Sequence, residues 1–342
     1  MKIAYVFAYF GDGGTEDHAT VLAKKAKESG NEPIFVISKY SDKAIEKLQD
    51  YKVIILPMDS SYNPFSVIKS VVGLKKIIKS ESVDLVHTHM PREQSLAIAV
   101  KMIGGKFKLV RTFHRLDHFT WKIKPFMPLF LKYTDRVIAI SDLMTRLLDE
   151  NGWKGSYTVV KNGVKKVNAP KHENAFGFIG RLSKEKGILQ FIKSNVKLLQ
   201  ENRLVVAGQG PDYEEIKDFS KKNNLKVELM GSVLEKSDFY KKASVLILPS
   251  SHEVLALVVL EAYSCGMPAL AFDIAPNIEL IKDENGALIK AYDYKKMGDE
   301  ALKILHKAES YKKTNIELYE SKYSDEIMWQ NTYRLYKSLF SK

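Results

Sequence analysis

Residues 175–187 read Ala-Phe-Gly-Phe-Ile-Gly-Arg-Leu-Ser-Lys-Glu-Lys-Gly, a short apolar run followed by a glycine and a cation-rich loop. The pattern predicts a buried strand over residues 175–179 that leads through this loop into a helix. Arg181 at the strand end and Lys186 at the helix start would place two cations beside the positive end of a helix dipole. That arrangement suits a diphosphate, because arginine offers a planar fork and lysine a movable point charge. A solvated loop in a Lys-rich chain is the alternative interpretation.

The same strand–loop–helix unit recurs along all 342 residues. Short runs rich in Val and Ile alternate with amphipathic stretches of helical length. Because the apolar runs are nearly continuous and are separated by helices, they predict a parallel sheet covered on both faces. Two such series predict an α/β protein with two doubly wound domains. The expected strands are residues 2–8, 33–37, 53–56, 84–87, 109–113, 136–140 and 158–160, then 175–179, 204–207, 226–230, 245–248, 269–272 and 287–289.

The boundary between the two series lies near residues 161–173, where an Asn-Gly pair and Pro170 interrupt the pattern amid charge. We therefore expect domains over residues 1–165 and 166–324, followed by a last helix over about residues 325–342. Doubly wound domains bind ligands in the loops at the carboxyl ends of their strands. Two facing domains would thus form a cleft between them.

The composition predicts a cytoplasmic protein. The single cysteine, Cys265, excludes an intramolecular disulfide framework and suits a reducing compartment. Apolar runs such as residues 254–260 are far shorter than the roughly 18 residues of a membrane span. A signal peptide is not expected, because acidic and Gly-rich sequence follows residues 3–10 directly.

The net charge of +12 is concentrated in the first half of the chain. Residues 101–132 hold eight basic residues against one acid, Asp117. Such a field attracts nucleic acid, anionic lipid or a phosphate-bearing substrate, although a merely solvated basic face is also possible. Nucleic-acid binding is not expected, because no helix-turn-helix, RNP or zinc pattern is present.

Two glutamates follow the predicted strand at residues 245–248. Glu253 falls in the loop after that strand, whereas Glu261 falls inside an otherwise apolar helix. A carboxylate in such surroundings is costly to bury unless a ligand or donor satisfies it. The pair could accept hydrogen bonds from hydroxyl groups at opposite ends of a sugar nucleotide. A buried glutamate held by backbone amides is the alternative for Glu261.

Gly13 and Gly14 come between the first predicted strand and a helix. Glycines there let the backbone approach a ligand, and the helix N-terminus favours an anion, but a simple tight turn explains them as well.

Three histidines, His87, His89 and His114, fall where two strands end. Zinc fits the residue type, but no adjoining cysteine or acidic ligand set has suitable spacing. We expect structural roles for His87 and His89, a more exposed place for His114, and no metal site. The sequence also lacks an Asp-X-Asp pair that could hold a divalent ion on a diphosphate.

Taken together, these segments resemble glycosyltransferase family 4, whose members have the GT-B fold of two facing Rossmann-like domains. The resemblance covers nearly the whole chain, and its landmarks occur in family order. They are residues 13–16, 87–89, 112–114, 141, 162–164, 180–182, 186–187, 208–211, 231–233, 249–250, 253, 261 and 265–268. In this fold the last helix would cross back onto the first domain.

The resemblance implies a role for each candidate residue. Arg181 and Lys186 would hold the donor diphosphate, Glu261 the nucleotide ribose and Glu253 the donor sugar. Gly13 and Gly14 would approach the diphosphate from the opposite domain. His114 would contact the sugar near the reacting carbon, so His114, Glu253, Arg181 and Lys186 are the expected catalytic residues.

One departure from the family pattern lies after Glu253, where Val254-Leu255-Ala256-Leu257 replaces the usual Gly-Phe-Gly. The backbone amides of Leu255, Ala256 and Leu257 could still face the sugar and phosphate. Side chains at positions 254 and 256 would narrow the pocket, which would change the donor sugar or abolish binding.

The resemblance implies retaining transfer of a sugar from a nucleotide-diphosphate sugar, with a UDP-sugar expected, to a cell-envelope glycan or lipid-linked acceptor. No metal or other cofactor is expected. Residues 119–130 interleave aromatics and lysines and could rest on the inner face of an anionic membrane, unless the aromatics pack against the core. A catalytically silent partner subunit and a sugar-nucleotide epimerase are the alternatives.

Overall fold

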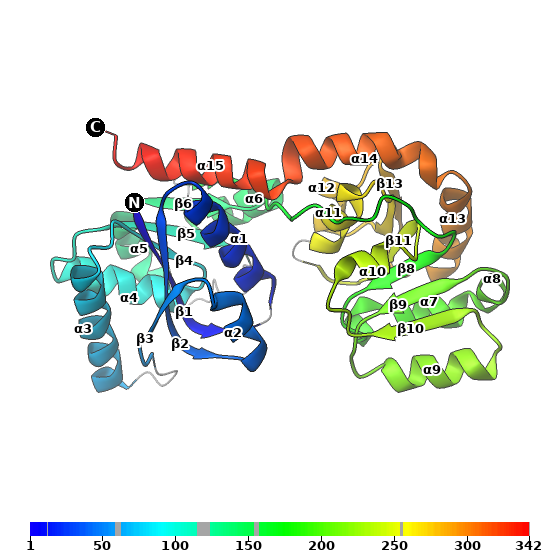
Figure 1. The fold of residues 1–342 in the computed structure, drawn as a ribbon, viewed down its shortest axis with the longest axis horizontal. Coiled ribbons are helices and arrows are strands. Elements are labelled where there is room, and N and C mark those ends of the chain that lie inside the picture. Colours follow the sequence, from blue (N-terminus) through cyan, green and yellow to red (C-terminus); the bar gives the residue numbers. More distant parts are fainter. Residues whose placement is uncertain (12, 59–62, 115–123, 154–156, 254–255, 342) are drawn as a thin grey trace. The chain divides into compact units, whose positions relative to one another are not determined.

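The computed structural model describes residues 1–11, 13–58, 63–114, 124–153, 157–253 and 256–341. These residues form two compact units, each built on one parallel sheet (Figure 1). Unit 1 comprises Met1–Gly163 and Asp325–Lys342, and unit 2 comprises Val164–Ser324. The chain therefore passes from unit 1 to unit 2 two residues before the boundary expected from the sequence.

The sheet of unit 1 has the strand order β3-β2-β1-β4-β5-β6-β7. All of its neighbouring strands are parallel. The order reverses between β1 and β4, so the loops after these two strands diverge to opposite faces of the sheet at this switch point. The strands are β1 (Lys2–Phe10), β2 (Glu32–Tyr40), β3 (Lys52–Ile55), β4 (Leu85–Thr88), β5 (Lys108–Phe113), β6 (Arg136–Ala139) and β7 (Tyr157–Val159).

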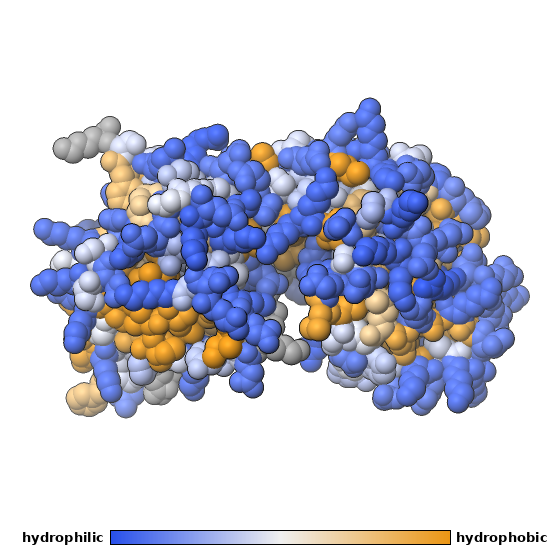
Figure 2. Space-filling view, in the orientation of Figure 1, coloured by the Kyte–Doolittle hydropathy of each residue, from blue (hydrophilic) through white to orange (hydrophobic). Residues whose placement is uncertain are grey.

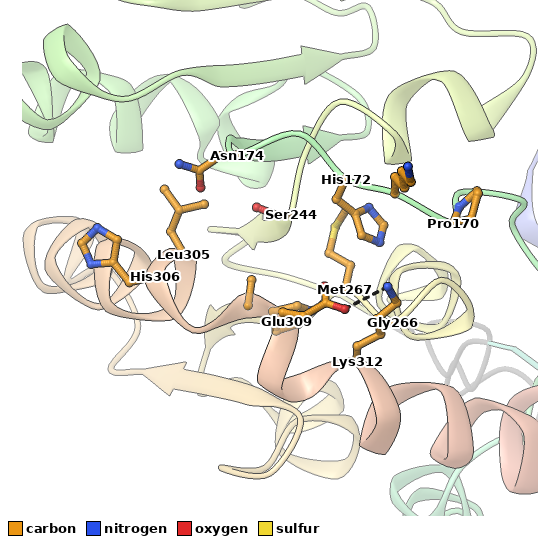
Figure 3. Close-up of a pocket in the computed structure, with 13 residues that line it drawn as sticks. Pro170, His172, Asn174, Ser244, Gly266, Met267, Leu305, His306, Glu309 and Lys312 are labelled. Atoms are coloured by element: carbon orange, nitrogen blue, oxygen red, sulfur yellow. Dashed lines mark hydrogen bonds and ion pairs between the residues drawn. The ribbon is translucent and has the colours of Figure 1, made fainter.

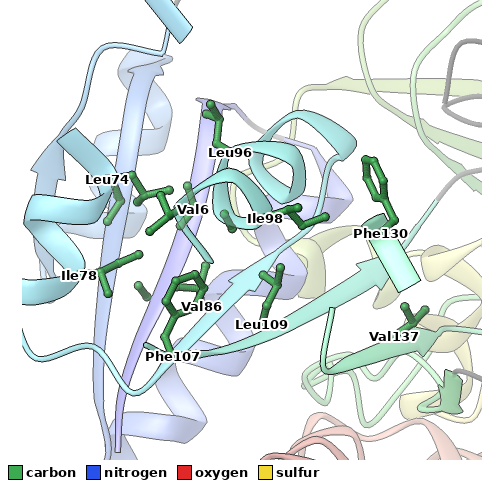
Figure 4. Packing of buried hydrophobic residues seen from close by; sticks show 14 of the residues in the cluster. Val6, Leu74, Ile78, Val86, Leu96, Ile98, Phe107, Leu109, Phe130 and Val137 are labelled. Carbon is green, nitrogen blue, oxygen red and sulfur yellow. The ribbon is translucent and has the colours of Figure 1, made fainter. Parts of the chain in front are cut away.

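Helices cover both faces of this sheet. One core contains apolar side chains of α3 (Pro64–Ser80), α4 (Pro91–Met102), α5 (Met127–Tyr133) and α6 (Asp142–Glu150). Figure 4 shows α3 and α4 side chains directed at the strand residues of this core. Full burial of such a side chain contributes about 1.5–3 kcal/mol, so this layer holds the sheet in place. The short η1 (Lys124–Phe126) precedes α5.

The other core of unit 1 lies under α1 (Gly14–Glu28), α2 (Asp42–Leu48) and the last helix, α15 (Asp325–Ser338). Figure 1 shows α15 beside α1. Trp329 is buried in this core, and its indole nitrogen donates a hydrogen bond to the hydroxyl of Ser29 at 2.8 Å. At the edge of the contact, Lys25 pairs with Glu326 at 3.0 Å. The last helix of the chain thus completes the core of the first unit.

The sheet of unit 2 repeats the doubly wound plan with the order β10-β9-β8-β11-β12-β13. Its strands are β8 (Phe176–Ile179), β9 (Leu204–Ala207), β10 (Val227–Gly231), β11 (Val245–Leu248), β12 (Ala269–Phe272) and β13 (Gly286–Ile289). The order reverses between β8 and β11, which is the switch point of this unit.

Two cores also flank the sheet of unit 2. Residues of α7, α8, α9 and α13 contribute to one, and residues of α10, α11, α12 and η4 contribute to the other. The helices are η2 (Lys184–Lys186), α7 (Ile188–Ser194), α8 (Val196–Glu201), α9 (Tyr213–Lys222), α10 (Lys236–Tyr240), α11 (Leu257–Ser264), α12 (Ala275–Leu280), α13 (Tyr294–His306), η3 (Ala308–Tyr311), α14 (Lys312–Leu318) and η4 (Tyr319–Tyr323).

The structure confirms the predicted fold class, with two doubly wound parallel sheets. The aromatic stretch of residues 119–130 falls partly outside the described residues. Within the described part, Met127 and Phe130 pack into the core, in agreement with the core-packing interpretation of this stretch. Phe126 is exposed, in agreement with the membrane-contact interpretation. No helix among the described ranges is long and apolar enough to cross a bilayer.

Candidate active site

The loops after β8 and β11 meet at the switch point of unit 2. Gly187 has φ +70°, and a Cβ there would lie 2.2 Å from the carbonyl oxygen of Pro249, so the two backbones touch where only glycine fits. The amide of Ser251 donates to the carbonyl of Glu185 at 2.9 Å. This contact places Lys186 and Glu253 side by side.

Lys186 and Glu253 form an ion pair, with 2.6 Å between Nζ and Oε1. The Glu253 side chain is 10% exposed and the Lys186 side chain 26%. Arg181, five residues before Lys186, is exposed and forms no hydrogen bond or ion pair with the described residues. One cation of the predicted diphosphate site is therefore paired with the predicted sugar-binding carboxylate, and the other faces solvent.

Glu261 is buried in α11 and is held by two side chains from α10. Its Oε1 lies 2.5 Å from Nζ of Lys236, and its Oε2 lies 3.0 Å from the hydroxyl of Tyr240. Burial, followed by the charge of Glu261, raises the pKa of Tyr240 well above its ordinary value, so the hydroxyl keeps its proton for donation. Side chains rather than backbone amides satisfy this carboxylate. The sequence analysis missed Lys236 and Tyr240, because no spacing rule links α10 to α11.

The segment between the two glutamates is described only from Ala256 onward. Ala256 is buried and precedes the first turn of α11, which has no side-chain cap. Leu257 is half-buried and packs against the core. Val254 and Leu255, which carry most of the departure from the family pattern, lie outside the described residues.

The glycine pair of unit 1 lies where β1 gives way to α1. Gly13 is the N-cap of α1 and Gly14 is its first residue. The carboxylate of Glu16 folds back over this turn, where it accepts a hydrogen bond from the amide of Gly11 at 3.2 Å. A Cβ on Gly13 would lie 2.7 Å from that carboxylate, so glycine leaves room for the Glu16 side chain.

Four buried histidines gather at the carboxyl-end loops of unit 1. Nδ1 of His89 lies 3.0 Å from Nε2 of His114, and His18 of α1 packs edge-on against His114 with 4.8 Å between ring centroids. His87 contacts the hydroxyls of Tyr336 at 2.5 Å and Thr112 at 2.8 Å. Burial lowers the pKa of all four imidazoles, to about 4 for His18, so they are neutral at pH 7. His114 is thus as buried as its neighbours, contrary to its expected exposure.

The sequence analysis missed His18 as a member of this cluster. His18 lies four residues after Gly14, and only the packing of α1 on the sheet brings it to His89 and His114.

The sequence analysis also missed a buried pair of charged residues, Glu93 and Arg111. Glu93 accepts a hydrogen bond from the amide of Ala8 at 2.6 Å, and burial raises the pKa of its carboxyl. Burial lowers the pKa of Arg111 to about 9, while the charge of Glu93 raises it. The Arg111 guanidinium lies over the ring of Phe113 at 4.7 Å. These charges lie beside the histidines.

A cavity of about 460 Å³ lies in unit 2, near the residues that precede β8, β11 and β12 (Figure 3). None of the predicted donor-site residues lines it. Lys312 and Glu309, which both line it, form an ion pair at 3.0 Å. Because the parallel strands begin here and end at the loops of Lys186 and Glu253, the cavity lies at the opposite edge of the sheet from the candidate active site.

Comparison with known proteins assigns the family. Residues 12–166 match the family model described as Glycosyltransferase Family 4, and residues 160–320 match the one described as Glycosyl transferases group 1. The two matches together span both units. The chain belongs to glycosyltransferase family 4. It is accordingly a transferase enzyme, as the resemblance predicted.

Individual relatives agree with this assignment. The glycosyltransferase is 27% identical to a protein of Methanocaldococcus jannaschii named as a glycosyltransferase, over 96% of this chain and 95% of the relative. It is also 27% identical, over 86% of this chain and 85% of the relative, to a Campylobacter jejuni enzyme. That enzyme is named as an α-1,4-N-acetylgalactosaminyltransferase acting on an undecaprenol-diphosphate-linked glycan.

One solved structure illustrates the shared GT-B fold. The Anabaena protein HepE, crystallised with UDP and glucose, matches with a TM-score of 0.81 and 16% identity, over 100% of both chains.

Proposed function

We propose that the enzyme is a retaining glycosyltransferase that moves a sugar from a UDP-sugar to a glycan or lipid-linked acceptor without a metal ion. The observation that carries this proposal is the Lys186–Glu253 pair, 2.6 Å apart at the switch point of unit 2. It places a phosphate-binding cation and a hydroxyl-binding carboxylate together where doubly wound domains bind ligands.

The donor is held mainly by unit 2. Arg181 and Lys186 bind the diphosphate, Glu261 accepts hydrogen bonds from the ribose hydroxyls, and Glu253 accepts them from the sugar. The match to a fold that HepE presents with UDP and glucose supports UDP as the nucleotide.

Two cations replace a metal ion in stabilising the leaving group. As the anomeric C–O bond breaks, positive charge develops on the sugar and negative charge on UDP. Arg181, Lys186 and the uncapped first turn of α11 favour that negative charge. The acceptor hydroxyl forms the new bond on the same face of the sugar, and the leaving phosphate takes its proton.

The acceptor is a glycan, free or carried on a polyprenyl diphosphate. The Campylobacter relative, named for such a lipid-linked acceptor, supports this class. The positive charge of residues 101–132 supports it as well, because a diphosphate lipid in an anionic membrane attracts cations. The enzyme thus works at the cytoplasmic face of a membrane.

The surface of unit 1 offers a contact for that membrane. Figure 2 shows apolar side chains gathered over the part of unit 1 where β2 and β3 lie in Figure 1. Exposed apolar residues of this region are Ile45, Ile55, Phe65, Ile68 and Val72, of which Phe65 is 83% exposed. On α3 they alternate with exposed lysines, a pattern typical of helices that lie on anionic lipid.

The donor site is tested by a thermal-shift panel of nucleoside diphosphates and their sugar conjugates. A ligand at about 100 times its dissociation constant adds roughly 2.7 kcal/mol of apparent stability. We expect stabilisation by the UDP series, lost in Arg181→Ala and Glu261→Ala. No shift with any donor would contradict the proposal and favour a silent partner subunit. Turnover of UDP-sugar into another UDP-sugar without acceptor would favour an epimerase.

The membrane contact is tested separately with liposomes. Vesicles that contain anionic lipid should retain the enzyme at low salt, and Phe65→Ser with Ile68→Ser should weaken retention. Absence of retention by the unmodified enzyme would contradict this part of the proposal alone.

A further inference from the structure

We propose that His18, His89 and His114 form a binding site for one transition-metal ion, with Zn²⁺ or Co²⁺ as the ions of suitable chemistry. The three side chains come from three elements of unit 1: α1, the loop after β4 and the loop after β5. One ring nitrogen from each lies within 4.8 Å of the others. All three residues are more than nine-tenths buried.

The hydrogen bonding of the cluster is incomplete. In the described part of the chain, Nδ1 and Nε2 of His18 and Nε2 of His89 are buried without a hydrogen-bond partner. Asn162 adjoins His18 but does not reach its ring with hydrogen-bond geometry. Buried polar atoms without partners are rare and costly, so unpartnered nitrogens on two of the three rings indicate a missing ligand. A metal ion or a water molecule could fill that place.

The donor set selects the class of ion. Three neutral imidazoles are typical zinc ligands and also suit Co²⁺ and Ni²⁺, whereas Mg²⁺ and Ca²⁺ prefer oxygen. Zinc–nitrogen bonds of about 2.0–2.1 Å hold the nitrogens of a tetrahedral site roughly 3.3 Å apart. His89 Nδ1 and His114 Nε2 lie 3.0 Å apart and share one proton in a hydrogen bond, which a metal ion bound between the two nitrogens would replace. A ring nitrogen of His18 lies within 4.8 Å of the ligand atoms of His89 and His114.

The surroundings hold the triad in place. The ring of His87 stacks on His89 with 4.5 Å between centroids, and Tyr336 and Thr112 fix His87 in turn. Phe7 stacks on the other side of His89 at 5.1 Å. Such outer contacts orient metal ligands. The positive charge of Arg111 disfavours a cation at this site, and the negative charge of Glu93 offsets the effect of Arg111.

This inference changes one expectation from the sequence, which placed no metal in the protein because His87, His89 and His114 lacked a further ligand at suitable spacing. His18 is that ligand, and only the fold reveals it. The three histidines belong to unit 1, whereas the Lys186–Glu253 pair of the proposed donor site belongs to unit 2. The titration measures metal binding alone, so either proposal can fail without the other.

The test is titration of the chelator-treated full-length protein with CoCl₂, followed by ZnSO₄. We expect one Co²⁺ per chain with tetrahedral ligand-field absorption in the visible, which Zn²⁺ then displaces. His18→Ala and His89→Ala should each weaken binding at least tenfold. His306→Ala, which removes an exposed histidine of unit 2, should leave it unchanged.

X-ray absorption spectroscopy of the loaded unmodified protein gives a result that needs no variant. Three imidazole ligands in the first shell support the site. Fewer than three, no ligand-field spectrum at full loading, or binding that survives in folded His18→Gln would overturn it. The buried nitrogens would then belong to a water-filled cavity.

Discussion

Lys186 and Glu253 lie 2.6 Å apart although they come from loops that follow two different strands, β8 and β11. The Glu253 carboxylate is the ion-pair partner of the Lys186 ammonium. An incoming diphosphate would draw the ammonium toward itself and release the carboxylate for a sugar hydroxyl. Under the proposed function, the pair would therefore couple the phosphate and sugar ends of one donor.

Lys186→Ala should reduce kcat/KM by about 10²–10³, because it removes a charge that stabilises the leaving group. Steady-state kinetics with the donor found by thermal shift measure the effect. Lys184→Ala is the control, since Lys184 is an exposed lysine of the same turn. Equal losses of kcat/KM in the two variants would mean that the effect comes from the overall positive charge of this turn and not from Lys186 itself.

Glu261→Gln should weaken UDP binding about tenfold to a hundredfold, because hydrogen bonds to a charged group contribute about 1.5–3 kcal/mol. The amide can still accept from Tyr240, so the fold should survive. Isothermal titration with UDP measures the change, and Glu214→Gln on the exposed face of α9 is the control. A variant with full UDP affinity but lower thermal stability would make Glu261 a structural residue only.

Comparison of Gly187→Ala with Gly30→Ala distinguishes the stability cost of a positive φ from the stability cost of a steric clash. Both glycines have φ near +70°, but a Cβ on Gly30 meets no atom within 4 Å, whereas one on Gly187 meets the Pro249 carbonyl at 2.2 Å. Gly30→Ala should cost about 1–2 kcal/mol in urea unfolding. Gly187→Ala should cost clearly more and also lower activity. Similar costs would contradict the close approach of the two loops.

Tyr336→Phe should destabilise unit 1 by about 1–3 kcal/mol, because it leaves Nδ1 of the buried His87 without its partner. Chemical denaturation measures the free energy of unfolding. Tyr333→Phe, on the half-buried side of the same helix, should change it by less than about 0.5 kcal/mol. A neutral Tyr336→Phe would mean that His87 finds another partner.

The thiol of Cys265 should not react with Ellman's reagent in the native protein at pH 8. Burial raises its pKa to about 12 from the ordinary 9.0, so almost no thiolate is present. Because the folded state keeps a proton that the unfolded state loses, this group favours unfolding increasingly as the pH rises from 9 to 12. One thiol per chain should react in guanidinium. Rapid labelling in native buffer would contradict the burial of α11.

Hydropathy was enough to predict the fold class, because the central strands of a doubly wound sheet are buried on both faces. The predicted strand bounds are wrong where a strand continues beyond its apolar residues. β2 was expected over residues 33–37 but continues to Tyr40, through the half-exposed Ser38 and the exposed Lys39 and Tyr40. β1 and β2 stay paired as far as Phe10 and Tyr40, and the hydropathy of these residues does not predict that pairing.

A residue of the candidate site could be predicted from the sequence only where the residues around it in the same segment identify it. A glutamate inside an apolar helix marks Glu261 from sequence alone. Its partners Lys236 and Tyr240 lie on another helix, and the contact depends on how α10 and α11 pack over the sheet. The same holds for His18, whose distance in sequence from His89 and His114 conceals their contact.

The last helix bears on how the chain acquires its structure during translation. α15 supplies Met328, Trp329, Leu335 and Tyr336 to the core under α1, yet it leaves the ribosome after all of unit 2. The part of that face that α15 covers must therefore stay exposed while another 161 residues, Val164–Ser324, are synthesised and begin to fold. A nascent chain stalled before Asp325 would expose an apolar surface to chaperones, and release of the final segment would end that exposure.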